Sequence, residues 1–260
     1  MIRSLILLFA LCVPTAYLAW NARDMPQFGL LGDDTVYFVG AKSLASGQGY
    51  RILSLPGAPA QTKYPPLYPL LLSPVWKINP QFPDNLRLAA LLAWLPVPVL
   101  LVLARRYFAH LGFGTKHAWI LCALMAVSAP VVTFSLNLMP ELAFTAVLVA
   151  CVMAADHETD ARWVVAAGVL AGVAYLLKAA ALPLLVTSPL LYLLRKRYRA
   201  ALLFFGAMLP FWAGWTFWAH THRVTYGDSS WLFYTDYLAY EAFNVSWQDF
   251  PLVLWTNLKT

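Results

Sequence analysis

The stretch LRLAALLAWLPVPVLLVLA, residues 86–104, decides the fold. It contains one charged residue, Arg87, and is about as long as the roughly 20 apolar residues that an α-helix needs to cross a bilayer. A basic pair, Arg105-Arg106, follows it directly, as is common where a transmembrane helix meets water. The stretch therefore predicts a membrane-spanning helix.

Six other apolar runs show the same pattern. They cover residues 5–20, 118–137, 142–155, 163–177, 180–194 and 200–219. Most approach spanning length, and flanking residues complete the shorter ones. The first run leads into aromatic and polar residues instead of a small-residue cleavage site, so it predicts an uncleaved helix. With no sheet-like alternation, the prediction is an all-α polytopic transmembrane bundle of about seven spans over residues 1–219.

Composition supports a membrane protein. The 260 residues are 61% hydrophobic and 12% charged, with a mean hydropathy of +0.63. A soluble domain carries about twice that charged fraction. The net charge is +6, but the basic residues lie in short connectors, which favours orientation in a membrane over nucleic-acid binding. The cysteines Cys12, Cys122 and Cys151 lie inside apolar runs, with neither metal nor disulfide spacing.

Residues 65–78, PPLYPLLLSPVWKI, are apolar but interrupted by four prolines. A segment of about 10–14 apolar residues, broken this often, is typical of an interfacial or re-entrant element. If it does not span, one side of the membrane receives nearly all the basic residues of the connectors: Arg3, Arg105, Arg106, Lys116, Arg162, Arg195, Lys196, Arg197 and Arg199. The positive-inside rule then predicts a multi-pass protein of the plasma (inner) membrane with a cytoplasmic N-terminus and an outward-facing loop over residues 21–85.

This topology gathers acids and lysines at the outer face. Asp33 and Asp34 lie in the first loop, Glu141 begins a span there, and Lys178 lies between two spans. A carboxylate can remove the proton from an acceptor hydroxyl or amine that attacks a sugar carbon. A lysine such as Lys63 or Lys178 can stabilise a departing phosphate. Two adjacent carboxylates repel each other, which raises one pKa or attracts a divalent metal ion.

Several segments, in this order, resemble the GT-C superfamily of polytopic glycosyltransferases, which includes protein O-mannosyltransferases and aminoarabinose transferases. They are GDDTVYFVGAKSLASGQGY (32–50), KYPPLYPLLLSPVWKI (63–78), NLRLAALLAWLPVPVLLVLARRYF (85–108), LNLMPELAFTAVL (136–148) and GVLAGVAYLLKAAALPLL (168–185). Members of this superfamily use polyprenyl-phosphate sugars. The resemblance implies sugar transfer from such a donor to a protein or glycolipid acceptor among the membrane lipids of the outer face.

The resemblance also implies roles for individual residues. Asp33 maps to the catalytic base, Asp34 and Glu141 to supporting acids, and Lys63 and Lys178 to partners of the donor phosphate. Family members are usually longer, so residues 1–260 are expected to be an N-terminal portion. Residues 220–260 are aromatic and predict an outer-face tail on the membrane surface.

Structural explanations compete with these roles. Asp33 and Asp34 can cap a helix that begins near them. Glu141 can favour a helix dipole, Lys178 can extend to the headgroups, and Lys63 can be a surface residue. Two other functions stay open: a carrier that binds polyprenyl phosphate without chemistry, and an inactive partial copy of an enzyme.

Overall fold

The computed structural model describes residues 2–223, 229–236, 240 and 245–259, and every regular element among these residues is helical. The α-helices are α1 (Ile2–Asn21), α2 (Asp33–Ala45), α3 (Leu67–Ile78), α4 (Leu86–Trp94), α5 (Pro96–His110), α6 (Thr115–Ala126), α7 (Ala129–Ser135), α8 (Glu141–Ala155), α9 (Ala161–Leu177), α10 (Leu184–Leu194), α11 (Tyr198–Thr221), α12 (Ser229–Thr235) and α14 (Phe250–Lys259). A short 3₁₀ helix, Ala179–Ala181, precedes α10. The predicted all-helical class is thus confirmed for the described part of the chain.

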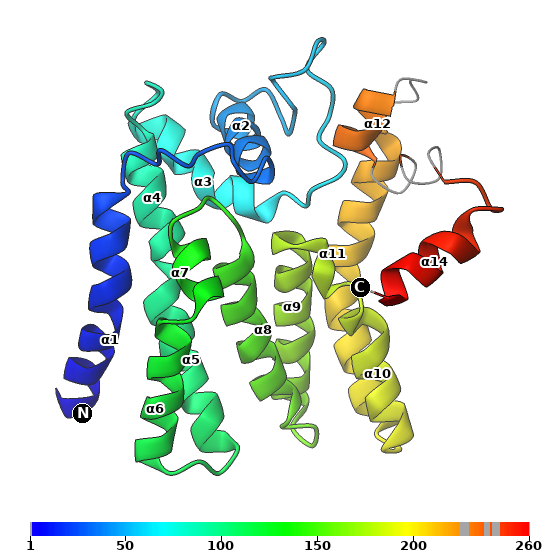
Figure 1. Ribbon diagram of the computed structural model, residues 1–260. Helices are drawn as coiled ribbons and strands as arrows, with labels where there is room; N and C mark the ends of the chain where they lie inside the picture. Colours follow the sequence, from blue (N-terminus) through cyan, green and yellow to red (C-terminus); the bar gives the residue numbers. More distant parts are fainter. Residues whose placement is uncertain (1, 224–228, 237–239, 241–244, 260) are drawn as a thin grey trace.

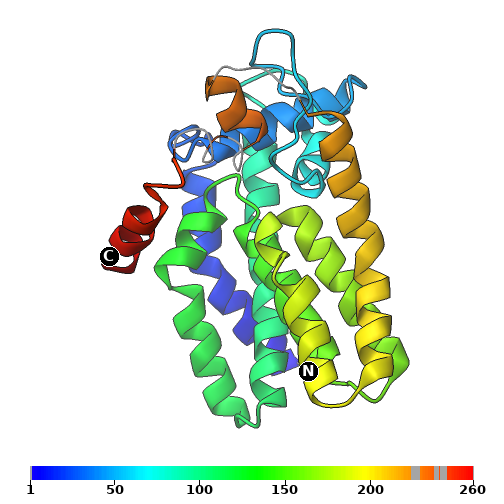
Figure 2. The ribbon, with the colours of Figure 1, turned by 90° about the vertical axis from the view of Figure 1, so that its right-hand side faces the viewer.

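The helices form two parts (Figure 1). A bundle of roughly parallel and antiparallel rods contains α1 and α4 to α11. Across one end lies a cap, which consists of α2, α3, residues 46–66 and α12; Figure 2 shows the same arrangement from the side. The N-terminus and the α5–α6, α8–α9 and α10–α11 connectors lie at the opposite end. We call this the basic end, because these connectors and their flanks carry the chain's main basic clusters.

Three helices are long and apolar enough to cross a membrane. They are Ile2–Asn21, Leu86–His110 (α4 and α5 taken together) and Tyr198–Thr221. If the bent pair α6 and α7 is counted as one span, the number of candidate spans rises to four. α8, α9 and the 179–194 segment are shorter apolar helices. Length and composition alone therefore support three or four crossings within the described residues, fewer than the predicted seven.

The bend between α6 and α7 measures 56° and has a local cause. Pro130 lies at the start of α7, four residues after Ala126, which ends α6. A proline ring clashes with the carbonyl four residues earlier and supplies no N–H, which favours a kink or a break of the helix at this point. The apolar run 118–137 therefore becomes two helices.

α9 and α11 share the most extensive interface between two helices in the described structure. Gly168 and Gly172, one turn apart on α9, make this approach possible. A Cβ atom at Gly168 would collide with the Phe204 carbonyl and the Ala207 side chain, and one at Gly172 would collide with the Phe211 ring. Small residues at this spacing let two helix backbones pack closely, as in many membrane bundles.

The segment expected to be interfacial forms α3 and belongs to the cap (Figure 1). Its Leu72, Val75 and Trp76 are buried against Phe38 of α2 and against α4. The indole N–H of Trp76 donates to the Phe38 carbonyl oxygen across 3.0 Å. This packing fixes α2, and with it the acidic pair, over the end of the bundle.

Candidate functional site

The two adjacent acids begin α2 but have different surroundings. Asp34 is fully buried, with 0% of its surface exposed. Its Oδ2 accepts a hydrogen bond from the Gly29 backbone N–H and its Oδ1 one from the Thr35 backbone N–H, each at 2.8 Å. Asp34 thus ties the preceding loop to the first turn of the helix, although the N-cap position is Gly32 and no side chain caps the helix.

Asp33 is half-buried and does not share these backbone partners. Its Oδ1 accepts a hydrogen bond from the Tyr64 hydroxyl across 2.5 Å, which joins α2 to the stretch before α3. No other hydrogen bond engages its carboxylate in the described part of the chain. One Asp33 oxygen is therefore held in place, while the other has no hydrogen-bond partner among the described residues, and we call this carboxylate half-available.

Glu141 and Lys178 meet at the cap end of the bundle. Glu141 is the first residue of α8, and Lys178 follows the last residue of α9. The ammonium nitrogen lies 2.6 Å from Glu141 Oε1, with 36% of the lysine side chain and 18% of the glutamate side chain exposed. Glu141 Oε2 is buried and has no hydrogen-bond partner among the described residues. The ion pair compensates the charge of a lysine that is only partly exposed.

Three tyrosines lie between the two carboxylates, and the sequence analysis gave them no role. Tyr37 forms edge-to-face contacts with Tyr64 and Tyr68, with ring centroids 5.1 and 5.3 Å apart. Burial raises the pKa of Tyr37, and the negative charges of Asp33 and Glu141 raise it further. These tyrosines therefore link Asp33 to the Glu141–Lys178 pair in one cluster of polar groups.

Tyr68 is the most enclosed member of this cluster. Burial raises its pKa well above the ordinary value, with further contributions from Glu141, Tyr37 and Asp34. Its hydroxyl has no hydrogen-bond partner in the described residues. A buried, unpaired hydroxyl carries a free-energy cost, so the site has donor capacity that a ligand could use. The signal in the sequence was the tyrosine in the KYPPLY motif.

Lys63 lies on the Asp33 side of the cluster. Its ammonium nitrogen lies 4.9 Å from the ring centroid of Tyr64 and 4.2 Å from that of Phe233 in α12. Burial lowers the pKa of Lys63, and the Asp33 charge partly offsets this. The position is thus more enclosed than a simple surface lysine, and it brings a cation near the half-available carboxylate.

An apolar cavity of about 480 Å³ adjoins this cluster. It is lined by Tyr50, Pro66, Leu176, Pro210, Phe211, Gly214, Trp215 and Trp218. The rings of Trp215 and Trp218 stack with centroids 5.4 Å apart. The Tyr50 hydroxyl donates to the Tyr64 carbonyl oxygen across 3.0 Å, so the cavity wall is joined to the residue that binds Asp33. Trp215 and Trp218 of α11 therefore line a cavity.

A smaller polar hollow of about 300 Å³ shares Trp215 with this cavity. Its lining includes His220, Arg223 and Asp236, and the Thr62 hydroxyl closes it against α12 by donating to the Thr235 carbonyl oxygen across 2.5 Å. Among the described residues, no three histidine, cysteine, aspartate or glutamate side chains gather as metal ligands.

No family model, curated protein or solved structure matches the chain. The site is accordingly interpreted from its own chemistry. The predicted residues fall into two linked pairs: Asp33 with Lys63, and Glu141 with Lys178. Asp34 lies apart from both, in contact with backbone N–H groups.

Proposed function

We propose that the protein is a membrane glycosyltransferase of the GT-C type, which transfers a sugar from a polyprenyl-phosphate donor to a protein or glycolipid acceptor. The observation that carries this proposal is the half-available carboxylate of Asp33, close to the cation of Lys63 and joined through Tyr64 to the wall of an apolar cavity. A base, a phosphate partner and an apolar cavity are the three features such a reaction requires.

The proposed topology has seven crossings: α1, α4–α5, α6–α7, α8, α9, the 179–194 segment and α11. The basic end faces the cytoplasm under the positive-inside rule, so the N-terminus is cytoplasmic and the cap lies outside. The membrane is the plasma (inner) membrane. The cap then covers the reaction site at the outer boundary of the bilayer.

In the proposed mechanism, the acceptor oxygen or nitrogen attacks the anomeric carbon and forms the new glycosidic bond. The bond from that carbon to the phosphate oxygen breaks, and the polyprenyl phosphate leaves with the electron pair. Asp33 takes the acceptor proton, while its hydrogen bond from Tyr64 keeps it oriented. The leaving phosphate gains negative charge at its bridging oxygen, and Lys63 compensates that charge.

Lys178 is a second phosphate partner, and it is paired with Glu141. Glu141 acts as a supporting acid that holds this lysine beneath the tyrosines. This mechanism does not require a divalent metal ion. Asp34 supports the mechanism indirectly, because its hydrogen bonds fix the start of α2. The prenyl chain occupies the cavity lined by Trp215 and Trp218.

The proposal is tested with membranes that contain the wild type or Asp33→Asn, supplied with a panel of radiolabelled polyprenyl-phosphate hexoses and pentoses. We expect the wild type to transfer label from one donor, and the variant to lose about 10²- to 10⁴-fold in rate, as general-base removal does. The variant should still accumulate in the membrane, because the amide oxygen of an asparagine at this position can accept the Tyr64 hydrogen bond. Unchanged transfer by Asp33→Asn would refute the assignment.

A second candidate is a polyprenyl-phosphate carrier without chemistry, which the apolar cavity beside Lys63 favours. Binding of labelled polyprenyl phosphate that is lost in Lys63→Gln, but kept in Asp33→Asn, with no sugar turnover in the wild type, would support the carrier over the enzyme.

A further inference from the structure

The basic end contains a hollow of about 490 Å³ between the beginnings of α9 and α11, on the side of the bundle away from the cap. It is lined by Glu158, Thr159, Ala161, Val164, Lys196, Arg197, Tyr198, Arg199, Ala200 and Leu203. Three of these side chains are basic and one is acidic, so the hollow carries a net positive charge. Neither Lys196 nor Arg199 forms an ion pair with any other described residue.

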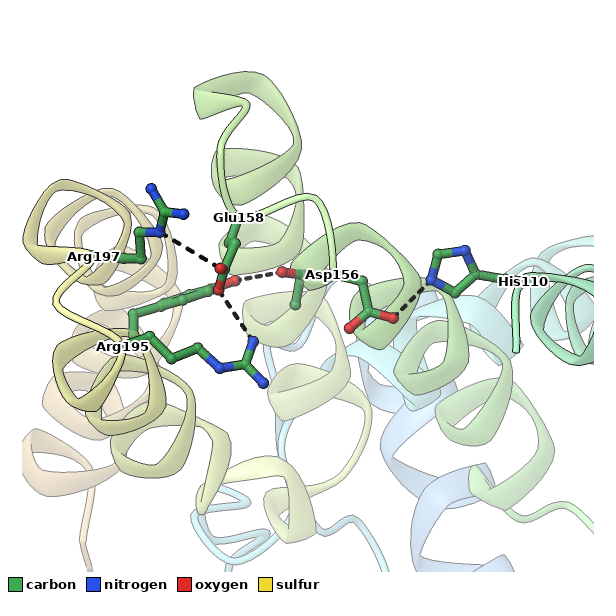
Figure 3. Close-up of polar contacts among 7 residues, drawn as sticks. His110, Asp156, Glu158, Arg195 and Arg197 are labelled. Atoms are coloured by element: carbon green, nitrogen blue, oxygen red, sulfur yellow. Dashed lines mark hydrogen bonds and ion pairs between the residues drawn. The ribbon is translucent and has the colours of Figure 1, made fainter. Parts of the chain in front are cut away.

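The acidic residue, Glu158, stabilises the α10–α11 turn. Glu158 binds Arg195 at 3.1 Å and Arg197 at 3.5 Å, and its carboxylate lies between the two arginines (Figure 3). The Arg197 backbone N–H also donates to the Tyr192 carbonyl oxygen across 2.7 Å, which closes the end of α10. Glu158 is thereby engaged by the turn, so Lys196 and Arg199 remain as cations that no internal carboxylate neutralises.

The hollow is polar at one end and apolar at the other. Lys196 and Arg197 belong to the α10–α11 turn and Arg199 to the first turn of α11, whereas the partly exposed Leu203 lies about one turn further along α11. The first turn of α11 adds to the positive potential, because the N-terminus of this helix has no side-chain cap. A small soluble anion would fill only the polar part and leave the apolar surface at Leu203 uncovered.

We propose that this hollow binds the headgroup of an anionic phospholipid, with the phosphate at Lys196 and Arg199 and the start of an acyl chain against Leu203. Basic pockets between transmembrane helices recognise such headgroups through charge, and the adjoining apolar wall favours a ligand that also carries an acyl chain. The inference requires that the bundle lies in a membrane and is independent of sugar transfer. It identifies a lipid site at the opposite end of the bundle from the Asp33 cluster.

The binding experiment uses the full chain, purified in detergent, and native mass spectrometry with phosphatidylglycerol or phosphatidylcholine. We expect retained phosphatidylglycerol and little phosphatidylcholine. Lys196→Gly with Arg199→Gln should weaken phosphatidylglycerol binding by roughly tenfold or more, given the attraction of each basic residue for an anionic surface. Lys196 adopts φ +59°, where glycine is favoured, so this substitution should not lower the thermal stability.

The matched control is Arg3→Gln with Lys116→Gln, which removes the same charge from the same end of the bundle outside the hollow. This control should keep phosphatidylglycerol binding. Ala161→Phe should weaken it without any change in charge, because the larger side chain occupies the hollow. Equal losses in the control and the site variant would overturn the proposal, as would equal retention of both lipids or full displacement by millimolar inorganic phosphate.

Discussion

The ammonium group of Lys178 lies 2.6 Å from Oε1 of Glu141, which joins the end of α9 to the beginning of α8 directly beneath the cap. The two helices are antiparallel neighbours, so a single pair fixes how their ends meet (Figure 1). The lysine backbone is extended, with φ −154° and ψ 128°, and the helix ends there. The ion pair therefore forms at the point where α9 ends.

Removing one member of this pair should cost more than removing both. Lys178→Met leaves a mostly buried carboxylate without its cation, and we expect a loss of about 1–3 kcal/mol in stability. The double variant Lys178→Met with Glu141→Gln should recover part of this loss, because no uncompensated charge remains. Thermal unfolding of the wild type, both single variants and the double variant in one detergent measures the coupling. Strictly additive losses would contradict the paired arrangement.

Substitution of Asp34 should lower the stability of the protein, whereas substitution of Asp33 should leave it nearly unchanged. Asp34→Ala leaves the Gly29 and Thr35 N–H groups without their acceptor, which we expect to cost at least about 2 kcal/mol. Asp33→Asn should change the melting temperature little, because an acceptor for Tyr64 is kept. Membrane accumulation and thermal unfolding of both variants test this contrast. A stable, abundant Asp34→Ala protein would show that its two backbone hydrogen bonds contribute little.

Polyprenyl-phosphate binding should weaken as the pH rises, and it should do so at a lower pH than the pKa of an ordinary lysine predicts. Burial lowers the pKa of Lys63 below its ordinary 10.5, so its ammonium group loses its proton at lower pH. The contribution of Lys63 to the free energy of unfolding changes in the opposite direction. The folded state disfavours the charged form of Lys63, so the protein becomes more stable as the pH rises through the lowered pKa. Lys63→Arg should bind with little pH dependence over the same range, because a guanidinium stays protonated. Identical pH profiles for the two proteins would exclude Lys63 as the phosphate partner.

The close packing of α9 against α11 should not accommodate a side chain at Gly168 or at Gly172. Gly168→Val and Gly172→Val place atoms against the Phe204 carbonyl and the Phe211 ring, so we expect loss of accumulation or a fall in stability of about 1–3 kcal/mol. Gly206→Ala is the matched control, since nothing lies within 4 Å of an added Cβ there. That control should be neutral or slightly stabilising. Thermal unfolding measured by fluorescence compares the three, and wild-type stability for Gly172→Val would mean that the helices pack differently.

Long apolar runs made the helices predictable. The runs 142–155 and 163–177 match α8 and α9 closely, because apolar residues and flanking charges mark both ends of each helix. The bend in 118–137 was missed, although Pro130 marked it. The Gly168–Gly172 spacing was also visible but not used. The number of crossings does not follow from these runs alone, because several are shorter than a bilayer is thick.

The candidate site was only partly predictable. Glu141 and Lys178 were expected at the same face, since adjacent antiparallel helices bring the start of one to the end of the other. The division of labour between Asp33 and Asp34 was not predictable, because it depends on how the loop before α2 folds back onto one carboxylate. Of the predicted tail, residues 220–260, α12 and α14 are described, and α12 supplies the Phe233 ring beneath Lys63.

The shortness of α8, α9 and the 179–194 segment has a consequence for the lipid around the protein. At 1.5 Å per residue, the 15 residues of α8 extend about 22 Å, against a hydrocarbon core of roughly 30 Å. α10 presents Val186, Leu190 and Leu194 at its exposed surface. In the proposed seven-crossing topology, a bilayer that seals against these helices must thin on that side or draw flanking residues inward. The protein would therefore deform its host membrane unevenly and favour thinner lipid regions.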